Sequence, residues 1–120
     1  MFAIKIKRIY DEPSKEDGYR MLVDRLWPRG VKKEGAHLDE WNKQIAPSPE
    51  LRKWFAHKAE HFKIFSERYR DELKEKREEL YRIKNIAVSK PLTLLYAAKD
   101  QKINHALILL SVLQQIGLKS

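Results

Sequence analysis

Residues 92–98, with the sequence LTLLYAA, are apolar at every position except Thr93. A strand that lacks the usual alternation of polar and apolar residues has no face for water. Such strands are typical of the centre of a parallel sheet that is covered on both faces. Residues 92–98 therefore predict the central strand of a largely parallel sheet.

Two segments earlier in the chain are expected to pair with this strand. In residues 2–9, four apolar residues alternate with basic ones, which is the period-2 pattern of a strand. Residues 19–27 begin as another apolar strand, centred on residues 22–26. We expect the three strands to be parallel neighbours whose carboxyl ends meet at one edge.

Helical spacing of apolar residues marks the remaining segments. Ser48 and Pro49 form a helix start, with a hydroxyl N-cap followed by proline at the first helical position. Asp100 is the expected N-cap of the last helix. The expected helices are a short one over residues 38–45, one from Ser48, a long one over residues 60–84 and one over residues 101–116; residues 32–36 are expected to form a loop.

The order strand, strand, helices, strand, helix is typical of an α/β protein. We expect residues 1–120 to form a single domain, a layered fold with a small, largely parallel sheet flanked by helices. No apolar run approaches the ~18 residues of a membrane span, and charges interrupt the first apolar segment as they would not in a signal peptide. We therefore expect a soluble, cytoplasmic protein.

Composition excludes some chemistry and favours anionic partners. The 120 residues contain no cysteine, which rules out disulfides, cysteine-bound zinc and thiol nucleophiles. The net charge of +8 is unevenly spread. Residues 1–33 hold nine basic and five acidic residues, residues 34–83 hold eleven of each, and residues 84–120 hold five basic and one acidic. The excess lies in the segments that carry the strands, where it would attract anions or would simply aid solubility.

The second strand ends in an unusual cluster, Asp24, Arg25, Trp27 and Arg29, before Gly30. Burying such charges without partners would cost several kcal/mol or more. They therefore pair with one another or face a pocket, and pockets in open α/β sheets lie at the carboxyl ends of strands.

The same residues carry a resemblance. Residues 22–30, together with residues 91–100 and 104–107, resemble the YeaO-like family of small bacterial proteins of unknown function. The resemblance covers almost the whole chain and implies an α/β fold and a cytoplasmic protein, with no established reaction. Many members of the wider group carry a Cys-His pair on the last loop; here Asn104 precedes His105, so thiol chemistry is absent.

The expected edge brings candidate ligand-binding residues together. Arg25, Arg29 and Lys99 are candidates for anion binding, because arginine matches carboxylate and phosphate groups in bidentate fashion. Trp27 would wall the pocket, and Asn104 lies near the amide groups at the start of the last helix, which also favour anions. The alternative is a closed network in which Asp11, Asp24 and Asp100 neutralise the three basic residues.

Asp24 and His105 are the candidates for catalysis, as a carboxylate and an acid–base partner. We expect His105 to line the same cavity as Asp24. The alternative is structural: Asp24 would orient Arg20 or Arg25, and His105 would donate to a loop carbonyl. Asp24, Asp100 and His105 could bind a divalent metal ion, but their spacing matches no known metal motif, and neither a metal nor a cofactor is predicted. His37, His57 and His61 are expected to face solvent.

Three functions remain as hypotheses. The first is an anion-binding pocket for a phosphorylated or carboxylated metabolite, with hydrolase or transferase chemistry led by Asp24. The second is nucleic-acid binding through the basic edge, although no recognised nucleic-acid motif is present. The third is a non-catalytic interaction module that uses the expected helix over residues 60–84. The sequence does not determine the oligomeric state.

Overall fold

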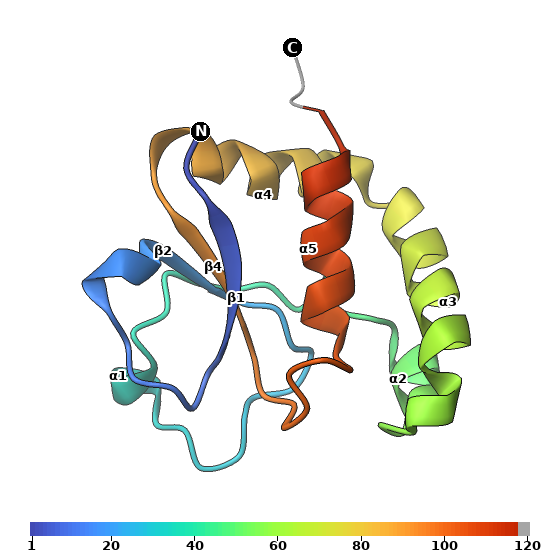
Figure 1. The fold of residues 1–120 in the computed structure, drawn as a ribbon. Helices are drawn as coiled ribbons and strands as arrows, with labels where there is room; N and C mark the ends of the chain where they lie inside the picture. The colour runs from blue at the N-terminus through green and yellow to red at the C-terminus, as the bar shows by residue number, and fades with distance from the viewer. Residues whose placement is uncertain (118–120) are drawn as a thin grey trace.

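A four-stranded, all-parallel sheet lies at the centre of the computed structural model, which describes residues 1–117 (Figure 1). The strand order is β1-β4-β2-β3. The strands are β1 (Ile4–Arg8), β2 (Tyr19–Leu22), β3 (Glu40–Trp41) and β4 (Leu92–Tyr96). The α/β class expected from the sequence is confirmed.

The apolar strand β4 occupies the centre of the sheet, as predicted. It pairs in parallel with β1, where Ile4 lies opposite Leu92, and with β2, where Leu22 lies opposite Leu95. All five of its residues are buried. Because β1, β4 and β2 run in one direction, their carboxyl ends meet at one edge, which lies at the bottom of Figure 1.

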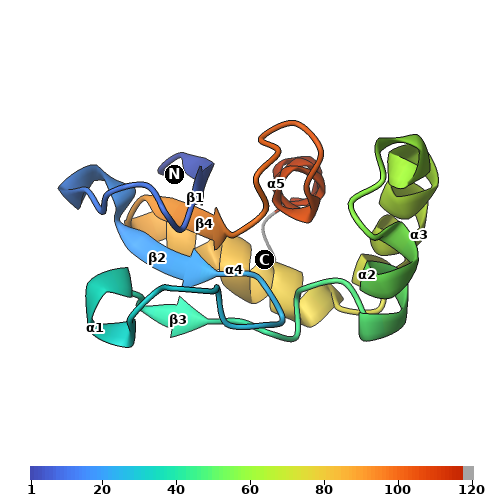
Figure 2. The ribbon, with the colours of Figure 1, turned by 90° about the horizontal axis from the view of Figure 1, so that it is seen from below.

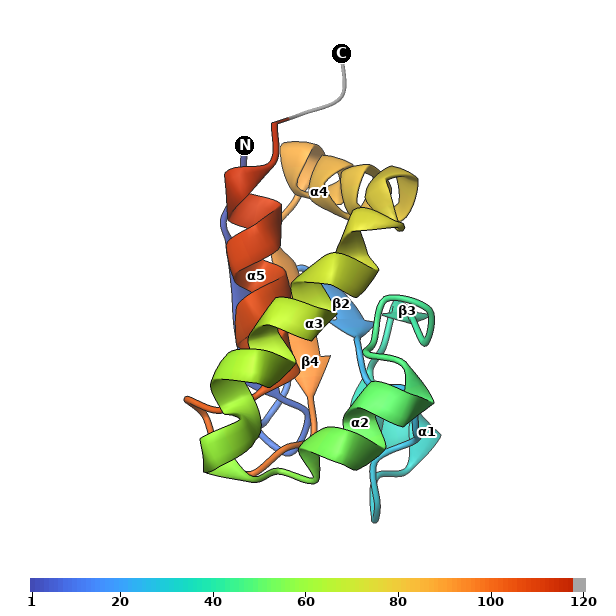
Figure 3. The same ribbon diagram turned by 90° about the vertical axis from the view of Figure 1, so that its right-hand side faces the viewer.

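The longer helices share one face of the sheet, as Figures 2 and 3 show. Apolar side chains of β4 and β2, such as Leu94 and Met21, pack there against buried residues of these helices, including Phe65, Tyr69 and Leu109. The helices are α1 (Lys33–Ala36), α2 (Pro49–Phe55), α3 (Phe62–Lys74), α4 (Arg77–Ser89) and α5 (His105–Gln115), with 3-10 turns at Lys15–Asp17 (η1) and Ala59–His61 (η2).

The other face of the sheet is covered mainly by loops, by η1 and by the short α1. A smaller core lies there, in which Leu95, Leu22 and Ile9 are buried with Ala36. Trp27 and Trp41 pack against this cluster.

The prediction of a short helix over residues 38–45 was wrong. Residues 40 and 41 form β3 instead, because Met21 and Leu22 pair with them on the open side of β2. The apolar residues at helical spacing also serve different cores: Leu38 and Trp41 pack in the smaller core, whereas Ile45 is buried in the larger one. The single turn of α1 forms within the predicted loop at residues 32–36.

Three boundaries also differ from the sequence predictions. The second strand ends at Leu22, so the charged cluster lies in the loop beyond it. The long helix over residues 60–84 is interrupted: α3 ends at Lys74, Lys76 is non-helical, and α4 continues to Ser89 at a steep angle to α3 (Figure 1). The last helix starts at His105 with Asn104 as its N-cap, four residues later than expected.

Among the described residues, no helix is both long enough and apolar enough to span a membrane.

Candidate functional site

A cavity of about 590 Å³ opens at the carboxyl edge of the sheet. Its lining comes from the loops that follow β1, β2 and β4, from the start of α5, and from α2, η2 and α3. The sequence prediction that the three strand ends meet at one edge is confirmed. That this edge binds a ligand stays a prediction. The lining residues include Tyr10, Asp24, Arg25, Trp27, Arg29, Arg52, Phe55, His57, Phe65, Lys99, Ile103, Asn104 and His105.

Asp24 and His105 lie together at this cavity, as predicted. His105 Nε2 is 3.2 Å from Asp24 Oδ1, and both side chains are only 16% exposed. The Asp24 Oδ2 atom accepts a hydrogen bond of 3.0 Å from the backbone N–H of Ala97, at the end of β4. Apart from this contact with His105, the buried Asp24 Oδ1 atom has no hydrogen-bond partner within residues 1–117. The pair thus joins the loop after β2, the end of β4 and the start of α5; a catalytic role for either residue stays a prediction.

The contacts of His105 fix which of its ring nitrogens carries a proton. Nε2 lies 2.9 Å from the carbonyl oxygen of Val23, and a carbonyl can only accept a hydrogen bond. Nε2 therefore carries a hydrogen, which it donates to Val23.

Arg25 is held in place by backbone carbonyls. Its Nε donates to the carbonyl of Pro47 at 3.1 Å and an Nη to that of Ala46 at 3.2 Å. Asp24 is therefore not its partner, and the alternative in which Asp24 orients Arg20 or Arg25 is wrong. Arg20 pairs with the buried Asp17 instead.

Trp27 forms a fixed wall of the cavity. Its indole N–H donates to the carbonyl of Val31 at 2.7 Å, and its ring meets Trp41 edge-on with ring centres 5.1 Å apart. The sequence prediction that Trp27 walls the pocket is consistent with this position.

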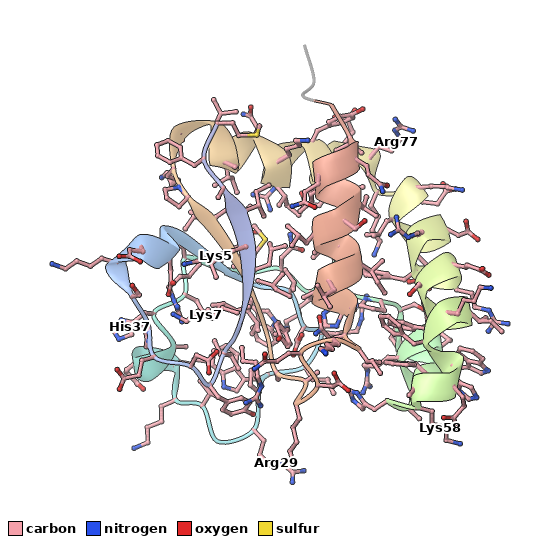
Figure 4. The ribbon with its side chains drawn as sticks, viewed as in Figure 1. Lys5, Lys7, Arg29, His37, Lys58 and Arg77 are labelled. Carbon is pink, nitrogen blue, oxygen red and sulfur yellow. The ribbon has the colours of Figure 1, made fainter. Side chains whose placement is uncertain are left out.

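Arg29 and Lys99 are exposed at the mouth of the cavity. Arg29 extends away from the lower edge of the molecule in Figure 4. The alternative network of three aspartates and three basic residues is not formed: within residues 1–117, neither Arg25, Arg29 nor Lys99 has a carboxylate within 4.0 Å. Asp100 accepts instead from the backbone N–H groups of Lys102 and Ile103.

Asn104 caps α5, a role that the sequence analysis assigned to Asp100. Its side-chain oxygen accepts from the N–H of Leu107, and its amide donates to the carbonyl of Asp100. The side chain is almost fully buried, so these bonds define its position. Binding of a ligand by Asn104 stays a prediction.

Two basic cavity residues were missed by the sequence analysis, Arg52 and His57. Arg52 is exposed near the middle of α2, and His57 follows that helix with a positive φ of 58°. Both line the cavity from the side of α2. His57 was expected only to face solvent, and no local pattern distinguishes it from His37 or His61.

Burial is the main cause of the pKa shifts of Tyr69 and Lys76, two residues close to the cavity residue Arg25. Burial raises the pKa of the Tyr69 hydroxyl well above its ordinary value, helped by the nearby carboxylates of Glu72 and Asp24. That hydroxyl donates to the carbonyl of Ile45 at 2.6 Å, so it stays protonated. Burial, and then the charge of Arg25, lower the pKa of Lys76. In the described part of the chain, no three His, Cys, Asp or Glu residues are grouped to hold a metal ion.

Comparisons with known proteins place the chain among relatives that lack an assigned activity. The family described as "Inactive DUF488-N3 subclade" matches residues 3–119. The protein named "Uncharacterized protein YeaO" from Escherichia coli K12 is 50% identical over 113 residues, which cover 94% of this chain and 98% of that protein. Uncharacterized proteins of Mycobacterium bovis and Mycobacterium tuberculosis are 36% identical over 112 residues, or 92% of each chain. No solved structure matches.

Proposed function

Because the chain belongs to the inactive DUF488-N3 subclade, we propose that it binds an anionic small molecule in the carboxyl-edge cavity without transforming it. The observation that carries this proposal is the charge of the cavity. Arg25, Arg29, Arg52 and Lys99 line it, and none of these four has an ion-pair partner in residues 1–117. Phosphate and carboxylate groups are the ligands that such side chains recognise.

The absence of turnover is supported by the geometry of Asp24 and His105. Asp24 Oδ2 is bonded to the backbone of Ala97, and the Nε2 proton of His105 is donated to Val23. These contacts serve to join β2, β4 and α5. No serine, threonine or cysteine lines the cavity within the described residues, so the usual hydroxyl and thiol nucleophiles are not in place.

Titration calorimetry with phenyl phosphate tests the proposal. We expect saturable binding, and we expect Arg29→Gln and Lys99→Gln each to weaken it at least tenfold, since one charge-assisted hydrogen bond contributes about 1.5–3 kcal/mol. Arg77→Gln is the matched control, because Arg77 is also exposed but lies at the opposite end of the molecule (Figure 4). Absence of binding, or equal losses in all three variants, would contradict the proposal.

Nucleic-acid binding is the second candidate, favoured by the exposed ring of Tyr10 beside Arg29 at the basic edge. Tyr10 is 45% exposed, and its hydroxyl donates to the Arg29 carbonyl. Single strands bind to such surfaces by stacking and charge. A single-stranded oligonucleotide should then lose affinity steeply with added salt. Affinity for the oligonucleotide that survives Arg29→Gln and Tyr10→Ala would exclude this edge as its binding surface.

A further inference from the structure

The cavity has room for more than a lone ion. At about 590 Å³ it lies well inside the range of about 300–1,000 Å³ that is typical of sites for small organic molecules. A lone phosphate or sulfate ion would leave most of this space filled with water. The cavity therefore has room for a ligand with a body as well as an acid group.

Apart from Arg25, which is held by backbone carbonyls, and the half-buried His105, the basic side chains of the cavity belong to two walls. Arg29 and Lys99 belong to the loops that follow β2 and β4, which form the sheet wall. Arg52 and His57 belong to α2 and the turn after it, which form the helix wall. Figure 1 shows α2 to one side of the strand ends, so the two walls belong to different parts of the fold.

The backbone of the helix wall is strained where it presents His57. Ala56 and His57 are consecutive non-glycine residues in the left-handed region, with φ of 49° and 58°. Such conformations cost of order 1–3 kcal/mol each and persist where the surrounding structure imposes them. His57, which follows Ala56 in this turn, lines the cavity and is exposed.

The space that both walls share is apolar and aromatic. Phe55 and Phe65 stack there with ring centres 4.2 Å apart, and Ile103 lies on the α5 side. Phe55 and Phe65 are each at most 5% exposed, so they form a firm floor. An apolar or aromatic ligand body would cover the half-buried Trp27 and Ile103 of the lining and exclude water there.

We infer that the ligand is two-headed: an elongated molecule with an acid group at each end and an apolar or aromatic body between them. One acid group contacts Arg29 and Lys99, and the other contacts Arg52 and His57. This inference rests on the proposed function and names the ligand class of the same site. It assigns ligand contacts to Arg52 and His57.

The first test compares alkane bisphosphonates with monophosphonates of the same chain length, by titration calorimetry at constant ionic strength. When the spacer matches the distance between the walls, the second head binds as an intramolecular event. We expect a best spacer at which the bisphosphonate binds at least tenfold more tightly than its monophosphonate, well beyond the statistical gain from two heads. Shorter and longer spacers should lose this advantage.

The second test removes one wall at a time. In the double variant Arg52→Gln/His57→Gln, the ratio of bisphosphonate affinity to monophosphonate affinity at the best spacer should fall at least fivefold. The monophosphonate should still bind at the sheet wall. Lys53→Gln is the matched control, since Lys53 is an exposed neighbour on the same helix but does not line the cavity. We expect Lys53→Gln to leave the ratio of bisphosphonate affinity to monophosphonate affinity unchanged.

The outcomes separate this inference from the proposed function. Equal affinity for both probe types at every spacer would overturn the two-headed ligand while leaving anion binding intact. An advantage that survives loss of Arg52 and His57 would overturn the assignment of the helix wall. If no phosphonate and no phenyl phosphate binds, the proposed function fails, and this inference fails with it.

Discussion

Asp17 is a fully buried carboxylate surrounded by three basic side chains. It pairs with Arg20, with Lys7 at 3.1 Å and with Lys5 at 3.3 Å, and it accepts from the backbone N–H of Ser14. Burial alone raises the pKa of this carboxyl, but the Ser14 N–H and the three basic side chains outweigh burial and lower the pKa to about 2. The network fastens η1 to β1 and β2.

Asp17→Asn should lower the free energy of unfolding by about 3 kcal/mol or more, because Arg20 would lose its buried partner. The folded-state pKa lies below the unfolded value of 3.8, so the loss should be constant at higher pH and shrink as the pH falls toward about 2. Urea denaturation at several pH values measures this. Asp71→Asn, which removes an exposed ion pair with Lys74, is the control and should change stability little.

Asp24 stabilises the fold by accepting a hydrogen bond from the backbone N–H of Ala97. Asp24→Ala should lower the free energy of unfolding by about 1–3 kcal/mol, since the Ala97 N–H would lose its acceptor. Asp24→Asn keeps an oxygen for that N–H and should lower it by less. Urea denaturation and hydrogen exchange of the Ala97 amide check both changes. Asp11→Ala, at an exposed position, is the control; equal losses in Asp11→Ala and Asp24→Ala would refute the structural role.

At the scale of elements, the start of α5 depends on Asn104. Its two side-chain hydrogen bonds, to Leu107 and Asp100, fix both the first turn of the helix and the loop before it. The position of His105 beside Asp24 follows from this cap, because His105 is the first residue of the helix.

Asn104→Ala should therefore cost about 1–2 kcal/mol of unfolding free energy, and Asn104→Ser, which keeps an N-cap oxygen, should cost less. Thermal and urea unfolding measure both. Ser89→Ala, near the exposed end of α4, controls for loss of a surface hydroxyl. If Asn104→Ala weakens phenyl phosphate binding without changing stability, the residue acts on the ligand and its role as a cap is secondary.

The interruption between α3 and α4 also depends on contacts with other parts of the chain. Lys76 leaves the helical conformation, and its amino group donates to the carbonyl of Gln44. The chain can then turn so that α3 buries Phe65 and Tyr69 while α4 buries Leu80 and Ile83 in the same core. Neither proline nor glycine marks this turn in the sequence.

At the scale of the whole molecule, the sheet separates two apolar cores of unequal size. Neighbouring side chains of β4 lie on opposite faces of the sheet: Leu94 is buried in the larger core and Leu95 in the smaller one. Since both side chains are fully buried, the loop-covered face contributes to stability as the helix-covered face does.

Leu94→Ala and Leu95→Ala should each lower the free energy of unfolding by about 2–5 kcal/mol, the usual range for a buried leucine. Leu26→Ala is the control, because Leu26 is 57% exposed, and should change stability little. Urea denaturation measures all three. A loss at Leu95 as small as that at Leu26 would show that the loops do not form a true second core.

Local sequence patterns determined much of this protein. An apolar run without alternation can only be stable inside a sheet, which placed residues 92–98 at its centre. Parallel strands must end at one edge, which brought Asp24, Lys99 and His105 to one cavity. These predictions succeeded because strand burial depends on a few consecutive residues, and strand direction on the order of strands and helices along the chain.

Only the tertiary structure decided the rest, because it depends on partners distant in the chain. Residues 40 and 41 became a strand because β2 offered them hydrogen bonds that outweighed their helical spacing. Arg20 took Asp17 as its partner, and Arg52 and His57 reached the cavity because α2 packs beside the strand ends. Periodicity shows which face of a segment is apolar. It does not show which distant segment covers that face, and here the second wall of the cavity comes from such a contact.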